Sequence, residues 1–493
     1  MKSPSQLSGS FLFLACILLA GYSGLAQVSP GMVGRPSTSS SGGAMPQLTI
    51  PSVPQGQDSL FGGVPSAPPT GQMLRLSLSD AIDRGLRQNL ALLLGEQGTR
   101  ASRARHMRAL SGLLPDVSAR TGETVQQVNL AALGLPTDLL PGISPIVSPF
   151  GVFDARAVVS QRVFDWKVIQ NTRSESENVN AARLSYRDTR ELVVLVVSTL
   201  YLREVQAKSQ VDAAQAQLET AKAVYQQAVD LEQAGVAAHI DVLRAQVEMQ
   251  AQQQRLLAAE NDLDKQKLAL ARAIGLAVGQ PFETSDAIPY SPLPPVSFEQ
   301  ALGDAYRNRP DYLQAQSLIR AAELARSAAV AGRFPTIGFD GDYGTIGRTP
   351  GNSHGTFTAA ATLQIPIFQG GRVRADVLEN DALLQERNAQ LGDLRNKIES
   401  EVRTAFIDVN TAAKQVEVAQ SSVGLATEQL QQSRDRLAAG VADTLEVVQA
   451  QEALATANDS YIAALYAHNI AKASLARAVG VAEQEIKQYL GGR

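Results

Sequence analysis

The sequence predicts a mainly helical chain with membrane β-strands, built as a duplicated helix–hairpin–long helix–helix unit. Three observations predict this fold class. The chain repeats its own motifs at a long interval, short segments in each copy alternate apolar and polar residues, and each copy contains a very long run with almost no proline or glycine. The elements follow in chain order.

The composition excludes several classes of function. A formal net charge of −4 and a pI near 5.8 are the wrong balance for a protein that binds nucleic-acid phosphates. Cysteine occurs once, at Cys16, so a disulfide framework is impossible and a thiol nucleophile or Cys/His metal site is disfavoured. The chain also lacks Gly-rich phosphate-loop, His-Glu-x-x-His and Gly-x-Ser-x-Gly motifs. We therefore expect no catalytic residue, metal or cofactor, and no enzyme activity.

Residues 1–26 are predicted to form a secretory signal peptide. Lys2 gives a basic start, residues 11–20 form an apolar run, and Gly24-Leu25-Ala26 supplies small residues before the expected cleavage point. Cys16 is a weaker candidate for lipidation, because the three residues before it fit a lipobox poorly. The signal peptide places the mature chain outside the cytoplasm.

Two pairs of motifs reveal the internal repeat. Ala-Gly-Val-Ala at Ala234 returns at Ala439, and Leu-Ala-Arg-Ala at Leu270 returns at Leu475, each 205 residues later. Earlier matches return after 220 residues, so the first copy carries about 15 additional residues before its Ala-Gly-Val-Ala motif. A repeat this long indicates a duplicated unit of several elements rather than a short-period solenoid.

The repeats set the predicted boundaries. Residues 73–284 form the first repeat and 285–484 the second, and a short tail covers 485–493. The segment 27–72 is rich in Pro, Gly and Ser with almost no charge, and we predict a disordered leader there. Each repeat opens with a helical stretch, at 77–113 and 297–333, broken near Asn89 and Pro310 and ended by Pro115 and Pro335.

A hairpin follows in each copy, at about 115–165 and about 335–368. In the second hairpin apolar residues such as Ile337 and Phe339 alternate with polar ones, which is the pattern of strands with one apolar face. The first hairpin repeats this more loosely, and its longer loop, at about 129–151, is expected to hold the additional residues.

The long helices come next. Trp166 to about Glu232 contains no proline or glycine, and at about 1.5 Å per residue such a helix is roughly 100 Å long. Arg372 to Leu437 is the second such run, and each run is followed by a return helix with apolar residues at coiled-coil spacing.

The strand pattern favours a membrane barrel. If the apolar faces meet lipid, the strands must close into a barrel, because open sheet edges do not occur in a bilayer. Each chain offers about four strands and membrane barrels start at about eight, so closure requires several copies. A soluble protein whose two hairpins pack on each other is the alternative.

The segment that runs from Ile365 to Arg372 (Ile-Pro-Ile-Phe-Gln-Gly-Gly-Arg) resembles the strand-to-helix signature of the TolC-like outer membrane efflux proteins. Pro366 is tolerated at a strand end, and Gly370 and Gly371 permit the abrupt change to helix. The resemblance also covers the duplication, the hairpins and the turn motifs, over roughly 77–484. Phe368 belongs to the same junction.

The resemblance implies a homotrimer, with a twelve-stranded barrel in outer-membrane lipid and a coiled-coil helical tunnel across the periplasm. It implies an exit duct for a tripartite efflux pump or type I secretion system. The implied partners are a periplasmic adaptor (membrane fusion) protein and an inner-membrane transporter of the RND, ABC or MFS type.

The turns between the long helices are the candidate sites. A glycine after a helix end is an ordinary cap, and the resemblance adds adaptor docking at these tips. The tip residues are Gly235, Val236, Asp241, Gly440 and Val441. In a trimer Glu446 would appear three times around one axis, and with Asp443 and Gln449 it is the candidate periplasmic aperture. The resemblance implies a basic, gate-locking residue in some relatives at the position of Ala442. Alanine has no charge, so we do not expect a salt bridge to lock the aperture here.

Two rival functions remain at this point. A periplasmic adaptor also has a long coiled-coil hairpin, although the duplication and the two strand hairpins disfavour it. A purely structural periplasmic coiled coil would need no strands that face lipid. Solubility that depends on detergent distinguishes the channel from both.

Overall fold

A computed structural model of the chain describes residues 58–130, 132, 144–286, 290–292, 297–439, 441–442 and 444–490. All of them belong to one compact unit, Ser52–Arg493, and the description concerns this unit alone. The predicted signal peptide, the lipidation candidate Cys16 and the leader up to residue 57 lie outside the described residues.

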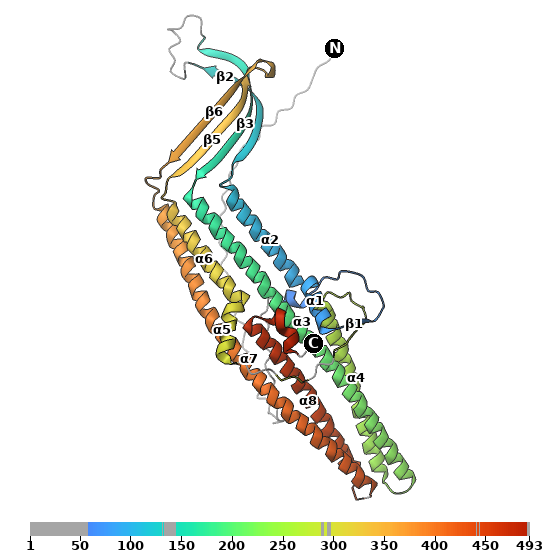
Figure 1. The fold of residues 1–493 in the computed structure, drawn as a ribbon. Helices are drawn as coiled ribbons and strands as arrows, with labels where there is room; N and C mark the ends of the chain where they lie inside the picture. Colours follow the sequence, from blue (N-terminus) through green and yellow to red (C-terminus); the bar gives the residue numbers. More distant parts are fainter. Residues whose placement is uncertain are drawn as a thin grey trace, which may run out of the picture. The chain divides into compact units, whose positions relative to one another are not determined.

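Each copy contains a short helix, a longer helix, a strand hairpin, a very long helix and a return helix (Figure 1). The helices are α1 (Leu78–Gln88), α2 (Leu90–Ser111), α3 (Trp166–Gln233), α4 (His239–Ala273), α5 (Phe298–Asn308), α6 (Pro310–Ala331), α7 (Arg372–Ala438), α8 (Thr444–Val479) and α9 (Ala482–Tyr489). The predicted breaks near Asn89 and Pro310 and both long helices are confirmed, with 68 residues in α3 and 67 in α7.

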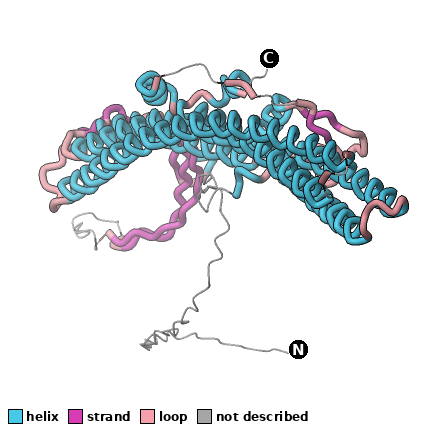
Figure 2. The backbone as a smooth tube through the Cα atoms, turned by 90° about the horizontal axis from the view of Figure 1, so that it is seen from below, coloured by secondary structure: helices cyan, strands magenta, loops and turns pink. Residues whose placement is uncertain are grey.

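The two hairpins form one antiparallel sheet. Its strands are β2 (Asp116–Asn129), β3 (Ile146–Phe164), β5 (Thr336–Gly347) and β6 (Ser353–Gln364), in the order β2-β3-β5-β6. The hairpin of the first repeat therefore pairs directly with the hairpin of the second repeat in the same chain, through β3 and β5. Figure 2 shows the strands gathered apart from the helices, since each hairpin extends from the helix ends.

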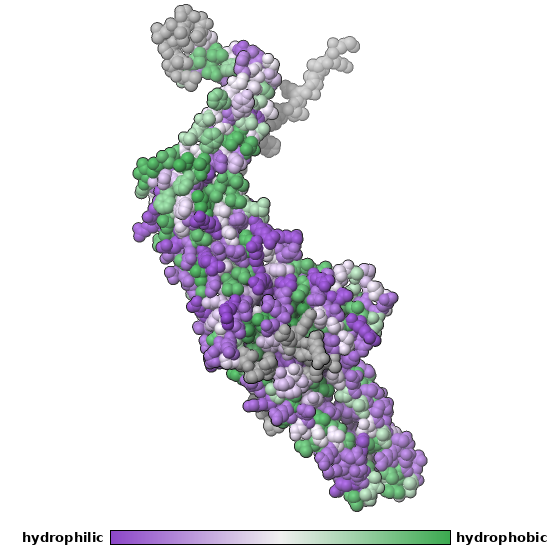
Figure 3. All heavy atoms as spheres, viewed as in Figure 1, coloured by the Kyte–Doolittle hydropathy of each residue, from purple (hydrophilic) through white to green (hydrophobic). Residues whose placement is uncertain are grey.

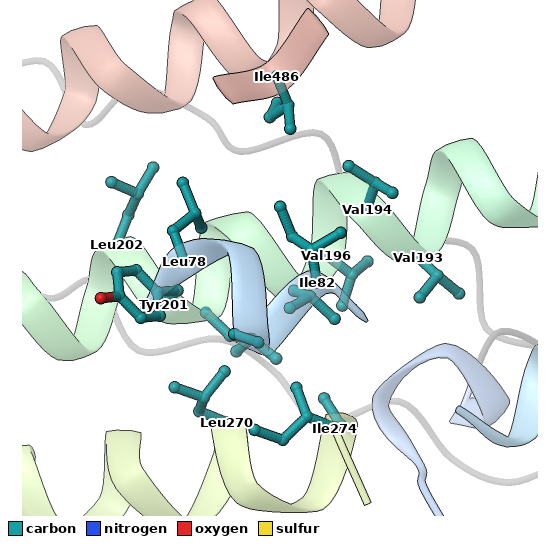
Figure 4. Close-up of a cluster of buried hydrophobic side chains, with 14 of the residues drawn as sticks. Leu78, Ile82, Val193, Val194, Val196, Tyr201, Leu202, Leu270, Ile274 and Ile486 are labelled. Carbon is teal, nitrogen blue, oxygen red and sulfur yellow. The ribbon is translucent and has the colours of Figure 1, made fainter. Parts of the chain in front are cut away.

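The largest core lies where the two copies meet, around the middle of α3. Apolar side chains of α1, α3 and the end of α4 pack there with residues of α8 and α9 (Figure 4). Val193, Val197 and Tyr201 of α3 are fully buried, which explains the apolar run in the sequence of this helix. A short parallel pair, β1 (Leu74–Leu76) with β4 (Phe282–Thr284), closes this region and was not predicted.

Three predicted boundaries need correction. The leader prediction of 27–72 extends too far, because Asp58–Phe61 form a 3-10 helix and Leu60 is buried in the core. The predicted tail at 485–493 overlaps α9, whose Ile486 is buried against α1 and α3 residues. The loop predicted at 129–151 is shorter, because β3 already begins at Ile146 and the additional residues are shared between longer strands and the loop.

Candidate functional site

The register of the sheet gives it two unlike faces. Ile337 lies opposite Leu363 and Tyr343 opposite Phe357, and across β3 and β2 the same face continues through Val159. Thr121, Glu123, Gln161, Thr345 and Ser353 are its polar residues in the paired region, and its larger part is apolar: Val117, Ala119, Val125, Phe153, Ala155, Ala157, Val159, Ile337, Phe339, Tyr343, Phe357, Ala359, Ala361 and Leu363. Tyr343 and Phe357 are 73% and 75% exposed, so no described part of the chain covers these two side chains of the apolar face.

The opposite face carries the charges. Of the eight Asp, Glu, Lys and Arg residues in the four strands, only Glu123 lies on the apolar face; the other seven are Asp116, Arg120, Asp154, Arg156, Arg162, Asp340 and Asp342. Arg156 Nε lies 2.6 Å from Asp154 Oδ1, and its Nη1 lies 3.2 Å from Asp342 Oδ1. Such a sheet suits a boundary between lipid and water.

The sheet also has two open edges. Among the described residues, β2 pairs only with β3 and β6 only with β5, so one edge of each outer strand has no partner there. Exposed backbone donors and acceptors along an apolar sheet are a template for a further strand. The chain thus presents a sheet of four strands that a second molecule of the same chain can extend.

The first helix turn forms as predicted. Gly235 adopts φ 72° directly after α3, and Val236 N donates to Leu231 O at 2.9 Å, which closes the helix end. Val236 is 75% exposed at the point of the turn. Asp241 lies in the first turn of α4 and pairs with Arg244 of the same helix at 3.3 Å.

The second turn repeats this hydrogen bond, because Val441 N donates to Arg436 O at 3.0 Å and Val441 is exposed. Gly440 and Asp443 lie outside the described residues. Glu446 lies 3.2 Å from Arg436 Nε of α7, and Ser433 Oγ lies 3.4 Å from Glu446 Oε1. Gln449 is exposed one turn further along α8. Glu446 is therefore held by an ion pair between α7 and α8 that sequence reasoning missed.

The two turns lie close together. One apolar cluster joins the α3–α4 pair to the α7–α8 pair just before the turns, and it contains Val224, Ala228, Val242, Ala245, Leu430, Val447 and Ala450. Because Val447 and Ala450 stand 205 residues after Val242 and Ala245, equivalent positions of the two copies contribute to the same contact.

The strand-to-helix junctions differ between the copies. After β6, Pro366 and the 88% exposed Phe368 lead to Gly370 and Gly371, with φ 59° and 84°, and α7 starts directly after them. Figure 3 shows apolar side chains gathered where the strands meet the helices. After β3, Asp165 alone forms the junction, and its carboxylate caps α3 by accepting from Val168 N at 3.2 Å.

Two buried polar residues at the helix breaks were missed by sequence analysis. Asn89 caps α2 and donates through Nδ2 to Leu60 O at 2.7 Å and to Ala273 O at 3.1 Å. Arg309 precedes α6, is 2% exposed, and donates to Asp311, Glu401 and Ala478 O. The available signal was a polar residue at the same break in both copies.

A buried histidine and lysine lie on α8 beside the segment between the copies. Lys472 Nζ donates to Ser291 O at 2.9 Å, and the His468 ring lies 5.0 Å from that of Tyr290. Burial lowers the pKa of Lys472 to about 8. Burial and the nearby Lys472 charge lower the pKa of His468 to about 4. Lys472 thus joins α8 to the segment between the two repeats, and His468 is buried beside it with 1% exposure.

A cavity of about 130 Å³ lies between the two helix pairs. Three glutamines from three helices line it, and Gln252 and Gln451 are 2% and 8% exposed. Both amide atoms of Gln451, Oε1 of Gln252 and Nε2 of Gln217 form no hydrogen bond within the described chain. The contact between the pairs is polar here and apolar nearer the turns.

No group of three or more His, Cys, Asp or Glu side chains within the described residues is arranged to hold a metal ion. None of the helices described has a segment apolar and long enough to cross a membrane.

Known proteins resemble this chain in sequence and fold. A sequence model described as outer membrane efflux protein matches residues 81–276 and 301–481, one match in each copy. Protein CyaE of Bordetella pertussis is 24% identical over 87% of this chain and 89% of its own length, and the alkaline protease secretion protein AprF of Pseudomonas aeruginosa is 22% identical over 66% and 69%. The Campylobacter jejuni CmeC outer membrane channel superposes with a TM-score of 0.70 at 17% identity, over 84% of this chain and 89% of that one.

Proposed function

Because this chain belongs to the outer membrane efflux protein family, we propose that three copies close a twelve-stranded barrel in the outer membrane and form one exit duct. The two-faced sheet with open edges carries this proposal. Four strands cannot close a membrane barrel, whereas three sheets of four can join edge to edge, β6 of one copy beside β2 of the next. The apolar face then meets lipid and the charged face lines water.

The family makes the chain a passive export channel of the outer membrane, in a tripartite efflux or secretion system. Membership of this family excludes the two rival interpretations, a periplasmic adaptor and a structural coiled coil. AprF is named for secretion of a protein, whereas TtgC, a 23% identical relative in Pseudomonas putida, is named for efflux of toluene. We propose export of small molecules or proteins, with the choice set by the partners.

The exposed turns are the proposed docking surface for a periplasmic adaptor. Val236 and Val441 are apolar, exposed and placed at equivalent turns, and Gly235 keeps its turn tight. An inner-membrane transporter of the RND, ABC or MFS type would complete the assembly. The separation from the strands follows from α3, which at about 1.5 Å per residue is roughly 100 Å long.

Glu446 is proposed to line the periplasmic aperture, together with Asp443 and Gln449. The pair with Arg436 holds its carboxylate in place, so the aperture would carry a bound rather than a mobile charge. We expect Glu446→Gln to release Arg436 and change single-channel conductance by about twofold. A conductance and cation preference equal to those of the unmodified protein would contradict this role.

The barrel itself is tested by one charge on either face of β6. Phe357→Asp puts a carboxylate on the apolar face, where a charge is unfavourable in lipid, whereas its neighbour Thr358→Asp puts the same group on the polar face. We expect the first variant to lose insertion and conductance in planar bilayers and the second to keep both. Equal behaviour of the two variants, or a wild-type protein that stays a soluble monomer, would overturn the proposal.

A further inference from the structure

The charged residues on the polar face of the sheet lie in rows across the strands, at different distances from the helices. Antiparallel register places Asp116, Ser160 and Asp340 in one row across β2, β3 and β5. Two residues further from the helices, Asp342 lies in the row of Ser118. The next row holds Arg120 and Arg156 side by side. Arg162 lies opposite Gly338 in the row nearest the helices, and Asp154 lies opposite Gly122 in the row beyond the arginines. Successive rows on one face are about 7 Å apart, and each row carries charge of one sign.

Ion pairs within the chain neutralise only part of this set. Arg156 is held between Asp154 and Asp342, and Arg162 lies 3.6 Å from Asp165. Asp116, Asp340 and Arg120 are all exposed, and within the described part of the chain none of them forms an ion pair. The Asp116/Asp340 row thus keeps two carboxylates per chain, and the arginine row keeps one guanidinium.

The unpaired charges of these rows would act on ions that pass through the duct. This inference rests on the proposed trimeric duct. In three copies the acidic row would hold six carboxylates around the lumen and the basic row three free guanidinium groups. We propose that the Asp116/Asp340 row gives the duct a preference for cations, which Arg120 partly opposes. The preference belongs to the barrel wall and is separate from any aperture at the helix turns.

Salt dependence is the signature of such a wall. The Debye length is about 30 Å at 0.01 M salt and about 3 Å at 1 M. Charges on the wall of a wide lumen therefore reach its centre only in dilute salt. A narrow aperture, in contrast, brings solute into contact with its charges at any salt concentration.

The test is the reversal potential of single channels in KCl gradients, with 30 mM against 10 mM salt compared with 3 M against 1 M. We expect Asp116→Asn/Asp340→Asn to lower the ratio of potassium to chloride permeability at least about twofold in dilute salt. Arg120→Gln should raise it, and the differences should vanish in concentrated salt. Ser118→Asn, between the rows and without change of charge, is the matched control.

The outcomes separate this inference from the proposed function. A wild-type protein without any conductance contradicts the trimeric duct itself. Trimers that conduct, with the same permeability ratio in dilute salt for the double variant and wild type, overturn the inference alone. It is also overturned if Arg120→Gln shifts the ratio in the same direction as the double variant, or if only Glu446→Gln changes it.

Discussion

The helix breaks before α2 and before α6 are equivalent positions in the two copies, yet one is neutral and the other charged. Asn89 donates to the carbonyl of Ala273, and Arg309, 220 residues later, donates to the carbonyl of Ala478, the equivalent residue at the end of the return helix. Both breaks therefore connect the opening helices of a copy to the end of its last long helix. The duplication preserved the contact and changed the donor.

The change of donor altered what surrounds it. The amide of Asn89 needs only two backbone carbonyls, so its pocket contains no charge partner. The guanidinium of Arg309 is equally buried and requires carboxylates, which Asp311 and Glu401 supply at 2.7 and 2.6 Å. A buried charge that is fully paired is tolerated, but each partner then depends on the others.

The largest expected effect comes from giving the second break the residue of the first. Arg309→Asn leaves Asp311 without its partner in a mostly buried place, and we expect a loss of about 3 kcal/mol in stability. The apparent Tm in detergent, followed by circular dichroism, measures it. Asn89→Ala is the matched variant, with an expected loss of about 1 kcal/mol. Equal losses in both would mean that charge is not the difference between the breaks.

The next effect is a pH dependence confined to the second copy. His468 stands where the first copy has Leu263, and its pKa is lowered to about 4. Because an unfolded histidine titrates near 6.5, the unfolded state binds the proton first as pH falls, and stability is lost from about pH 6.5 down to pH 4.

We expect this group to account for about 2 kcal/mol between pH 7.5 and pH 5. His468→Leu, which copies the first repeat, should reduce the fall in apparent Tm over that range. The charged group that acts on His468 is Lys472, and its pKa of about 8 keeps it mostly protonated over this range. An unchanged pH profile in the variant would show that His468 is not responsible.

The smallest effect concerns the contact between the two helix pairs. Gln451 is buried in the cavity with both amide atoms unbonded within the described chain, so Gln451→Leu should raise stability by about 1 kcal/mol. Gln253→Leu, on an exposed face of α4, is the control and should be neutral. A lower apparent Tm for Gln451→Leu would indicate that its amide is hydrogen-bonded in the assembled protein.

Most of the fold was predictable because its signals are local and repeated. The period-two alternation around Phe339 gave the strands, and the absence of proline after Trp166 gave the long helix. The pairing of β3 with β5 was not predictable, because it joins segments about 180 residues apart and no local pattern encodes it. The α9 helix was missed because its eight residues are held by tertiary contacts, the burial of Ala482 and Ile486 and the ion pair of Glu483 with Arg190.

The candidate sites were predictable to different degrees. Gly235 and Gly371 adopt the left-handed backbone that their place in the sequence indicated. The partner of Glu446 was missed, because Arg436 comes before the turn and reaches it only when α7 and α8 lie antiparallel. The shared role of Asn89 and Arg309 was missed, because the repeat shows a polar residue at each break but not the buried carbonyl that each one contacts.

The unequal junctions imply unequal mechanical coupling in the two halves of the chain. One residue, Asp165, connects β3 to α3, so twisting of that helix is passed almost directly to the strand. The segment from Ile365 to Gly371 connects β6 to α7, and its two glycines allow backbone rotation between the strand and the helix. A rotation of α7 can therefore be taken up at these glycines before it reaches β6. A rotation of α3, in contrast, is transmitted to β3.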